Sequence, residues 1–89
     1  MEQLTLYGYF LIRSKKRTHT IVQDLIDDMK RDKELIGLSG AAIVSHIRWN
    51  CCDGAIEALR KFLRAYRAYC GRNGYAYETE AFEEMRKWG

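Results

Sequence analysis

The side chains best suited to chemistry are one histidine and three cysteines: His46, Cys51, Cys52 and Cys70. Together they match the ligand count of a Cys₃His zinc site. Their spacing argues against such a site, because the chain has no Cys-x₂-Cys pair and adjacent cysteines do not readily reach one tetrahedral ion. The sequence therefore predicts reduced, apolar thiols and a helical histidine, with no metal and no other cofactor.

Nucleophilic catalysis is the second chemistry that these side chains offer. His46 could meet Cys51 or Cys52 across a turn, with Asp53 nearby as an orienting group. No nucleophile elbow or glycine-rich phosphate loop surrounds them. Residues 71–74 contain two glycines, but they follow a predicted helix rather than a strand and fit a helix stop better. We therefore expect a protein that is not an enzyme.

The charge pattern offers a stronger lead, which is a line of arginines on the longest predicted helix. Arg60, Arg64 and Arg67 are spaced i, i+4 and i+7, so they share one helix face, named here the arginine ridge. Lys61 flanks the ridge and Arg72 follows it. Guanidinium groups match the geometry of phosphate and carboxylate, so the ridge predicts a nucleic-acid backbone or an acidic protein as partner. The alternative is an ordinary solvated helix face.

Two further sets of residues are candidates for partner contacts. A basic turn after the first predicted helix contains Arg13, Lys15, Lys16 and Arg17. Aromatic residues at predicted helix ends or in loops are Trp49, Tyr75 and Trp88. Exposed amphipathic rings of this kind often anchor protein interfaces.

Apolar residues spaced near 3.6 indicate a chain of helices that must position these side chains. The predicted helices span residues 5–13, 19–33, 40–49, 54–70 and about 79–88. The first places apolar residues at positions 6, 7, 10 and 11, while the acidic face of the second carries Asp24, Asp27 and Asp28. The expected class is an all-α bundle of four or five helices.

Single positions carry specific expectations. Ser39 is expected to cap the third helix, with Ala41 or Ala42 allowing close approach of a neighbour. Gly71 suits the left-handed residue that ends a helix. An extended conformation of residues 75–77 is the less favoured alternative for that segment.

The composition limits the class of protein. The chain has 89 residues, 47% of them apolar and 30% charged, with a net charge of +3. This predicts one small globular domain, with a core at residues 4–70 and an added helix at 71–89. No stretch is long enough to span a bilayer, and the Leu4–Ile12 segment lacks the features of a signal peptide. With its unpaired cysteines, the chain is expected to be cytoplasmic.

Residues 4–69 resemble the YozE family of short bacterial proteins with a SAM-like helical fold. The shared cues are an aromatic first helix (Leu6–Phe10, then Arg13), an acidic second helix, a helix that starts at Ser39, and a closing helix that carries Phe62 and Tyr66. The Phe-Pro pair that the family commonly has before the serine is absent here, and residues 71–89 extend past the usual end. The resemblance implies a non-enzymatic bacterial or phage protein.

The leading functional expectation is a module that binds a protein partner sterically, as a phage or mobile-element modulator of a host machine would. Exposed rings would be buried at the centre of the contact, and the arginine ridge would pair with acids at its rim. The alternative is an accessory protein that binds a nucleic-acid backbone through the ridge. A homo-oligomer, with the acidic face of the second helix against the ridge, stays open. No membrane partner is expected.

Overall fold

The computed structural model describes residues 2–15, 21–50 and 53–87. Its helices are α1 (Leu6–Arg13), α2 (Ile21–Arg31), the short 3₁₀ helix η1 (Lys33–Leu35), α3 (Gly40–Asn50), α4 (Asp53–Asn73) and α5 (Thr79–Lys87). Within these ranges there is no β-strand, only one isolated bridge between two extended segments. The predicted all-α fold is confirmed.

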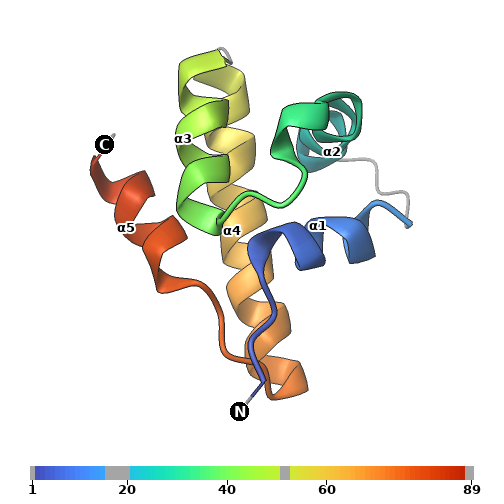
Figure 1. Cartoon of the computed structure of the whole chain (residues 1–89), viewed down its shortest axis with the longest axis vertical. Helices are drawn as coiled ribbons and strands as arrows, with labels where there is room; N and C mark the ends of the chain where they lie inside the picture. The colour runs from blue at the N-terminus through green and yellow to red at the C-terminus, as the bar shows by residue number, and fades with distance from the viewer. Residues whose placement is uncertain (1, 16–20, 51–52, 88–89) are drawn as a thin grey trace.

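The long helix α4 is the centre of the arrangement (Figure 1). Helices α3 and α4 run antiparallel, and α2 packs against the first part of α4. Helix α5 lies along the outer side of α3, while α1 fills the space beside the α3–α4 pair. Each helix therefore has one face turned toward a shared core, as the amphipathic pattern requires.

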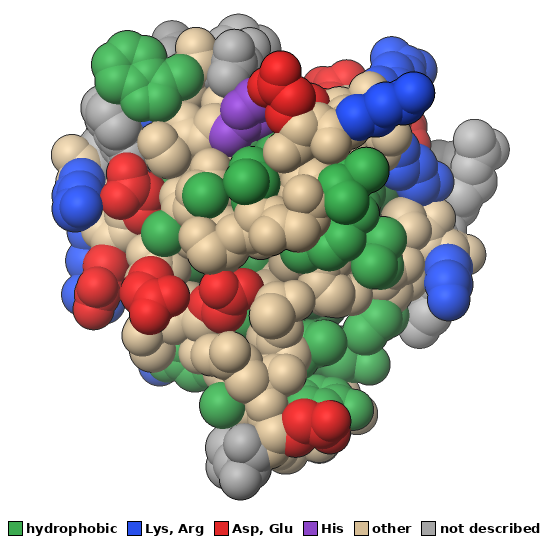
Figure 2. All heavy atoms as spheres, viewed as in Figure 1, with side chains coloured by type: hydrophobic (Ala, Val, Ile, Leu, Met, Phe, Trp, Pro, Cys, Tyr) green, Lys and Arg blue, Asp and Glu red, His purple; other side chains and the backbone are tan. Residues whose placement is uncertain are grey.

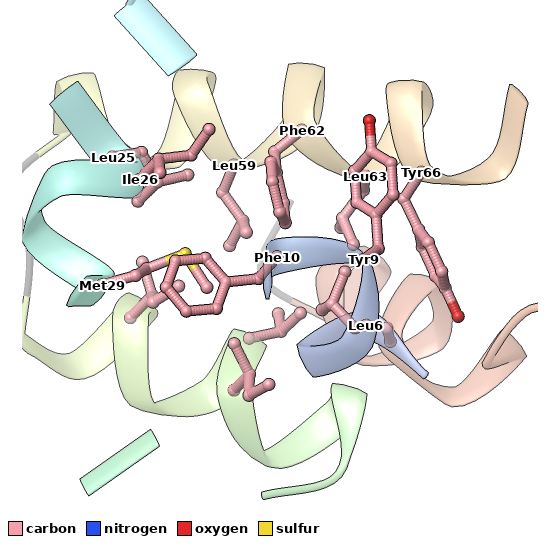
Figure 3. Packing of buried hydrophobic residues seen from close by; sticks show 14 of the residues in the cluster. Leu6, Tyr9, Phe10, Leu25, Ile26, Met29, Leu59, Phe62, Leu63 and Tyr66 are labelled. Carbon is pink, nitrogen blue, oxygen red and sulfur yellow. The ribbon is translucent and has the colours of Figure 1, made fainter. Parts of the chain in front are cut away.

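The core of α1 differs from the predicted one. Leu6 and Phe10 are buried as expected, but Leu11 is 45% exposed and Tyr9 is only 1% exposed. The ring of Tyr9 points at α4, with its centroid 5.2 Å from that of Phe62 (Figure 3). The prediction that Leu11 is buried was wrong. The aromatic rings of α4 pack against Tyr9, three residues after Leu6, so the core-facing side of α1 carries Tyr9 and not Leu11.

The cores of α2 and α3 follow the predicted period. The buried residues are Leu25, Ile26, Met29, Ile43, Val44 and Ile47. Ser39 caps α3 by accepting a hydrogen bond from the Ala42 amide at 3.2 Å. A close approach of a neighbour is found at Gly40, directly before Ala41 and Ala42, where an added Cβ would be 3.1 Å from the Cβ of Ala81. Gly40 is the first residue of α3, so α5 contacts the N-terminal end of α3 at this point.

Helix α4 continues past the predicted stop at Gly71. It ends at Asn73, and the left-handed residue is Gly74, with φ of 74°. The Tyr75 amide donates to the Cys70 carbonyl at 2.9 Å, which is the long closing bond of a Schellman cap. Gly71 and Gly74 are both of the residue type that ends helices, and the hydrogen bond from Tyr75 to Cys70 shows that Gly74 is the one that ends α4.

The two glycines provide a matched pair of substitutions. We expect Gly74→Ala to lower the free energy of unfolding by about 1 kcal/mol, because alanine resists a positive φ. Gly71→Ala should raise it by about 0.5–1 kcal/mol, because an added Cβ meets nothing within 4 Å and alanine favours helix. Urea denaturation of both variants measures the difference. Destabilisation of similar size in both would contradict the cap at Gly74.

Residues 75–77 are extended, which was the less favoured alternative. The Leu4 amide donates to the Ala76 carbonyl at 3.0 Å, and the Ala76 amide donates to the Glu2 carbonyl at 2.9 Å. Figure 1 shows the two segments side by side at one end of the bundle. This pairing satisfies backbone groups that a lone extended segment would leave to solvent. It also fixes the start of α5 against the start of α1.

A buried carboxylate, Glu78, joins three helices at this end. One of its oxygens accepts from the Leu6 amide at 2.7 Å, and the other accepts from the Gly40 amide at 2.9 Å. These amides begin α1 and α3, so one negative group satisfies donors at two helix N-termini. The Tyr66 hydroxyl of α4 donates to the Leu4 carbonyl at 2.5 Å and accepts from the Glu78 amide at 2.7 Å. We call this set the Glu78 junction.

Burial raises the pKa of Tyr66 from 10.0 to about 12. A raised pKa in the folded state means that folding favours the neutral phenol. Its contribution to stability is complete below pH 10 and is lost as the pH rises through 12. We therefore expect the free energy of unfolding to fall by roughly 1–2 kcal/mol between pH 9 and pH 11.5. Chemical denaturation at pH 9 and pH 11.5 measures it, and a Tyr66→Phe variant should lack that component.

Candidate functional site: a groove between α4 and α5

The arginine ridge lies on the exposed face of α4. Arg60, Arg64 and Arg67 are all exposed, and none forms an ion pair with another residue of the described ranges. Their opposite face is buried, with Leu59, Phe62 and Leu63 in the core. The cations are therefore available to a partner, while the apolar side of the same helix holds the bundle together.

The ridge forms one wall of a groove that the sequence did not predict. Helix α5 supplies the other wall, and the groove has a volume of about 320 Å³. Its lining residues are Arg60, Leu63, Arg64, Arg67, Phe82, Met85 and Arg86. We call it the arginine groove. Arg86 of α5 is the fourth arginine at its rim.

The apolar floor of the arginine groove rests on a stack of aromatic rings. Phe82 lies parallel to Tyr66, with centroids 6.3 Å apart, and edge-on to Tyr77 at 5.3 Å. Both tyrosines pack in or against the core, so Phe82 is held from below. The guanidinium carbon of Arg67 lies 5.6 Å from the centre of the Tyr77 ring, a cation–π contact that orients it. The floor and one rim arginine are thus prearranged.

The lining limits the chemistry of the groove. Among the described residues that line it, the charged side chains are all arginines, which carry a positive charge. An arginine in that state has no lone pair with which to accept a proton. The arrangement is suited to binding an anion next to apolar surface.

The other predicted contact residues are scattered over the molecule. Lys15, Lys61 and Arg72 are exposed. Arg13 is half-buried and donates to the Tyr9 hydroxyl at 2.8 Å, so it is partly engaged within α1. Lys16, Arg17 and Trp88 lie outside the described residues.

The two described aromatic candidates differ in exposure. Trp49 is 72% exposed near the end of α3. Tyr75 is half-buried and packs against the core, which leaves only part of its ring for a partner. Neither residue lines the arginine groove.

The histidine has other neighbours than those considered from the sequence. His46 Nε2 lies 2.5 Å from Asp32 Oδ2, and His46 Nδ1 lies 3.8 Å from Glu34 Oε2. In Figure 2 the histidine is seen at the surface beside an acidic side chain. The hydrogen bond with His46 holds the pKa of Asp32 below its usual value. Cys70 is fully buried, and its burial raises the pKa of the thiol. Cys51 and Cys52 lie outside the described residues.

Comparison of the chain with protein-family models, curated proteins and solved structures gives no match. The resemblance to the YozE family therefore stays a prediction. None of the described helices has the length and apolar character needed to cross a bilayer. The geometry of the arginine groove is therefore the main guide to function.

Proposed function

We propose that the protein is a non-enzymatic interaction module that holds an acidic, amphipathic segment of a protein partner in the arginine groove. The observation that carries this proposal is the combination of four arginines with an apolar floor in one groove. The apolar side of the segment would cover Phe82 and Met85, and its carboxylates would pair with the arginines. A module of this kind acts by occupying its partner's surface, which is how a small modulator of a larger machine works.

The apolar floor favours a protein partner over nucleic acid. Phosphate would be held by the rim but would leave the half-buried Phe82 and Met85 uncovered. A carboxylate-bearing segment with apolar residues complements both parts of the surface.

Fluorescence anisotropy with three labelled probes tests the proposal. The first is a synthetic amphipathic peptide with glutamates on one helical face and leucines on the other. The second has the same composition in scrambled order, and the third is a short DNA duplex. We expect the amphipathic peptide to bind at least about tenfold more tightly than the scrambled one, a difference of about 1.4 kcal/mol. Its affinity should fall modestly with salt, since part of the contact is apolar.

The other outcomes separate the alternatives. Equal binding of the two peptides would show that charge alone is recognised and would overturn the proposed role of the floor. Tighter binding of the duplex, with affinity falling by orders of magnitude between low and moderate salt, would favour the nucleic-acid alternative.

A further inference from the structure

We propose that Asp32, Glu34 and His46 form a surface site for a divalent transition-metal ion, with zinc as the best match. The site lies where η1 meets the middle of α3, and none of its residues lines the arginine groove. The inference is therefore independent of the proposed function.

The three side chains already converge on a small volume. Each offers one ligand atom, and these atoms lie within 4.8 Å of one another. Imidazole nitrogen and carboxylate oxygen bind zinc at about 2.0–2.2 Å, so ligand atoms around a tetrahedral ion are roughly 3.3 Å apart. His46 Nε2 and Asp32 Oδ2, now 2.5 Å apart, must therefore separate by roughly 1 Å to admit the ion.

Local structure allows this adjustment. The Glu34 side chain is 80% exposed, so it can swing toward the ion at little cost. Asp32 uses its other oxygen, Oδ1, to accept the Glu34 amide at 3.0 Å, which caps η1. One oxygen can thus bind metal while the other keeps the cap. The His46 side chain is only 19% exposed, and its Nε2, next to Asp32, would be the nitrogen donor. Glu34 Oε2 now lies 3.8 Å from Nδ1, so its carboxylate must turn to the Nε2 side of the ring.

A small, mainly apolar cavity with three polar side chains in its lining lies beside these groups and is the second observation. It has a volume of about 30 Å³ and is lined by Asp28, Asp32 and His46 above an apolar floor. This is enough room for an ordered water, which the fourth position of a three-ligand zinc site requires. Asp28 is a second carboxylate in the walls beside Asp32, and the negative charge of the two groups favours a divalent cation.

The donor set selects the class of ion. A site with one imidazole and two carboxylates suits zinc better than calcium or magnesium, which take oxygen ligands alone. Bound metal would tie the α2–α3 connection to α3. The competing interpretation of the same geometry is a hydrogen bond from His46 to Asp32 with no role for metal.

Isothermal titration of the full chain with zinc chloride tests the site. The background is a Cys51→Ser/Cys52→Ser variant, so that these two adjacent thiols cannot supply the heat. We expect one zinc ion per chain. Loss of a group that only supports a metal ligand weakens metal affinity by about 10–100-fold, so His46→Gln, which removes a ligand, should weaken it by more than that. Asp32→Asn keeps an acceptor for the η1 cap and should weaken zinc similarly. The matched control is Asp24→Asn, an exposed acid of α2, which should leave affinity unchanged.

Cobalt(II) supplies a spectroscopic readout of the ligands in the wild-type chain. Imidazole and carboxylate ligands should give weak visible bands that are lost in His46→Gln. Intense near-ultraviolet thiolate absorption that persists in that variant would assign the metal to cysteine and overturn the proposal. Absence of zinc binding in the Cys51→Ser/Cys52→Ser background, or equal affinity in His46→Gln, would overturn it as well.

Discussion

Replacing Glu78 by alanine is expected to lower the free energy of unfolding by about 3–5 kcal/mol. The carboxylate is 7% exposed and accepts hydrogen bonds from the first amides of α1 and α3. Its removal leaves two buried donors without an acceptor, each at a cost of about 1–3 kcal/mol, and takes a negative charge away from two helix N-termini. Because the chain is small, this is a large part of its total stability.

The glutamine variant separates charge from shape. Glu78→Gln keeps one oxygen for either the Leu6 or the Gly40 amide, but its NH₂ group must face the other donor. We expect a loss of about 2–3 kcal/mol, between wild type and the alanine variant. Urea denaturation followed by circular dichroism measures all three proteins.

Glu83 of α5, the helix that begins directly after Glu78, provides the control. Its side chain is exposed, so Glu83→Ala should change the free energy of unfolding by no more than about 0.5 kcal/mol. If Glu78→Ala cost no more than Glu83→Ala, the two helix starts would not depend on this carboxylate, and the account of the Glu78 junction would be wrong.

Reversing the arginine ridge is expected to abolish binding of the amphipathic acidic peptide. The triple variant Arg60→Glu/Arg64→Glu/Arg67→Glu places three negative charges where carboxylates of the peptide must approach. We expect an affinity loss of roughly 100-fold or more, because attraction becomes repulsion at each contact. The three side chains are exposed and make no ion pair among the described residues, so the fold should be retained. Anisotropy measures the affinity, and the unfolding midpoint checks the fold.

A second triple variant removes the effect of net charge. Lys30→Glu/Arg31→Glu/Lys33→Glu changes the total charge equally, but these cations belong to α2 and η1. We expect it to bind the peptide within about threefold of wild type, because exposed charges beyond a Debye length are largely screened. Equal losses in both triple variants would mean that the peptide senses overall charge rather than the groove.

Part of this molecule follows directly from local sequence pattern. The period of 3.6 predicted the helices, the buried stripes of α2, α3 and α4, and the outward position of Arg60, Arg64 and Arg67. All of these depend on residues within a few turns of one another. Ser39 was predicted as a cap for the same reason, since a capping side chain bonds within its own first turn.

Other features depend on residues far apart in the chain. A Thr-Glu-rich stretch before a short helix gives no sign that Glu78 is buried, because its hydrogen-bond partners start α1 and α3. Arg86 joins the groove, and His46 meets Asp32, only because separate helices pack side by side. Tyr9 is chosen over Leu11 for the core by the rings of α4.

The sequence by itself thus determined which segments are helical, which face of most helices is apolar, and where the main line of cations lies. Tertiary structure alone decided how the ends of the helices meet, which glycine stops α4, and which side chains share the arginine groove and the Glu78 junction. The physical reason is the range of the forces involved. Periodicity and capping act within a few residues, whereas packing, burial of a charge and the shape of a groove arise only when distant segments come into contact.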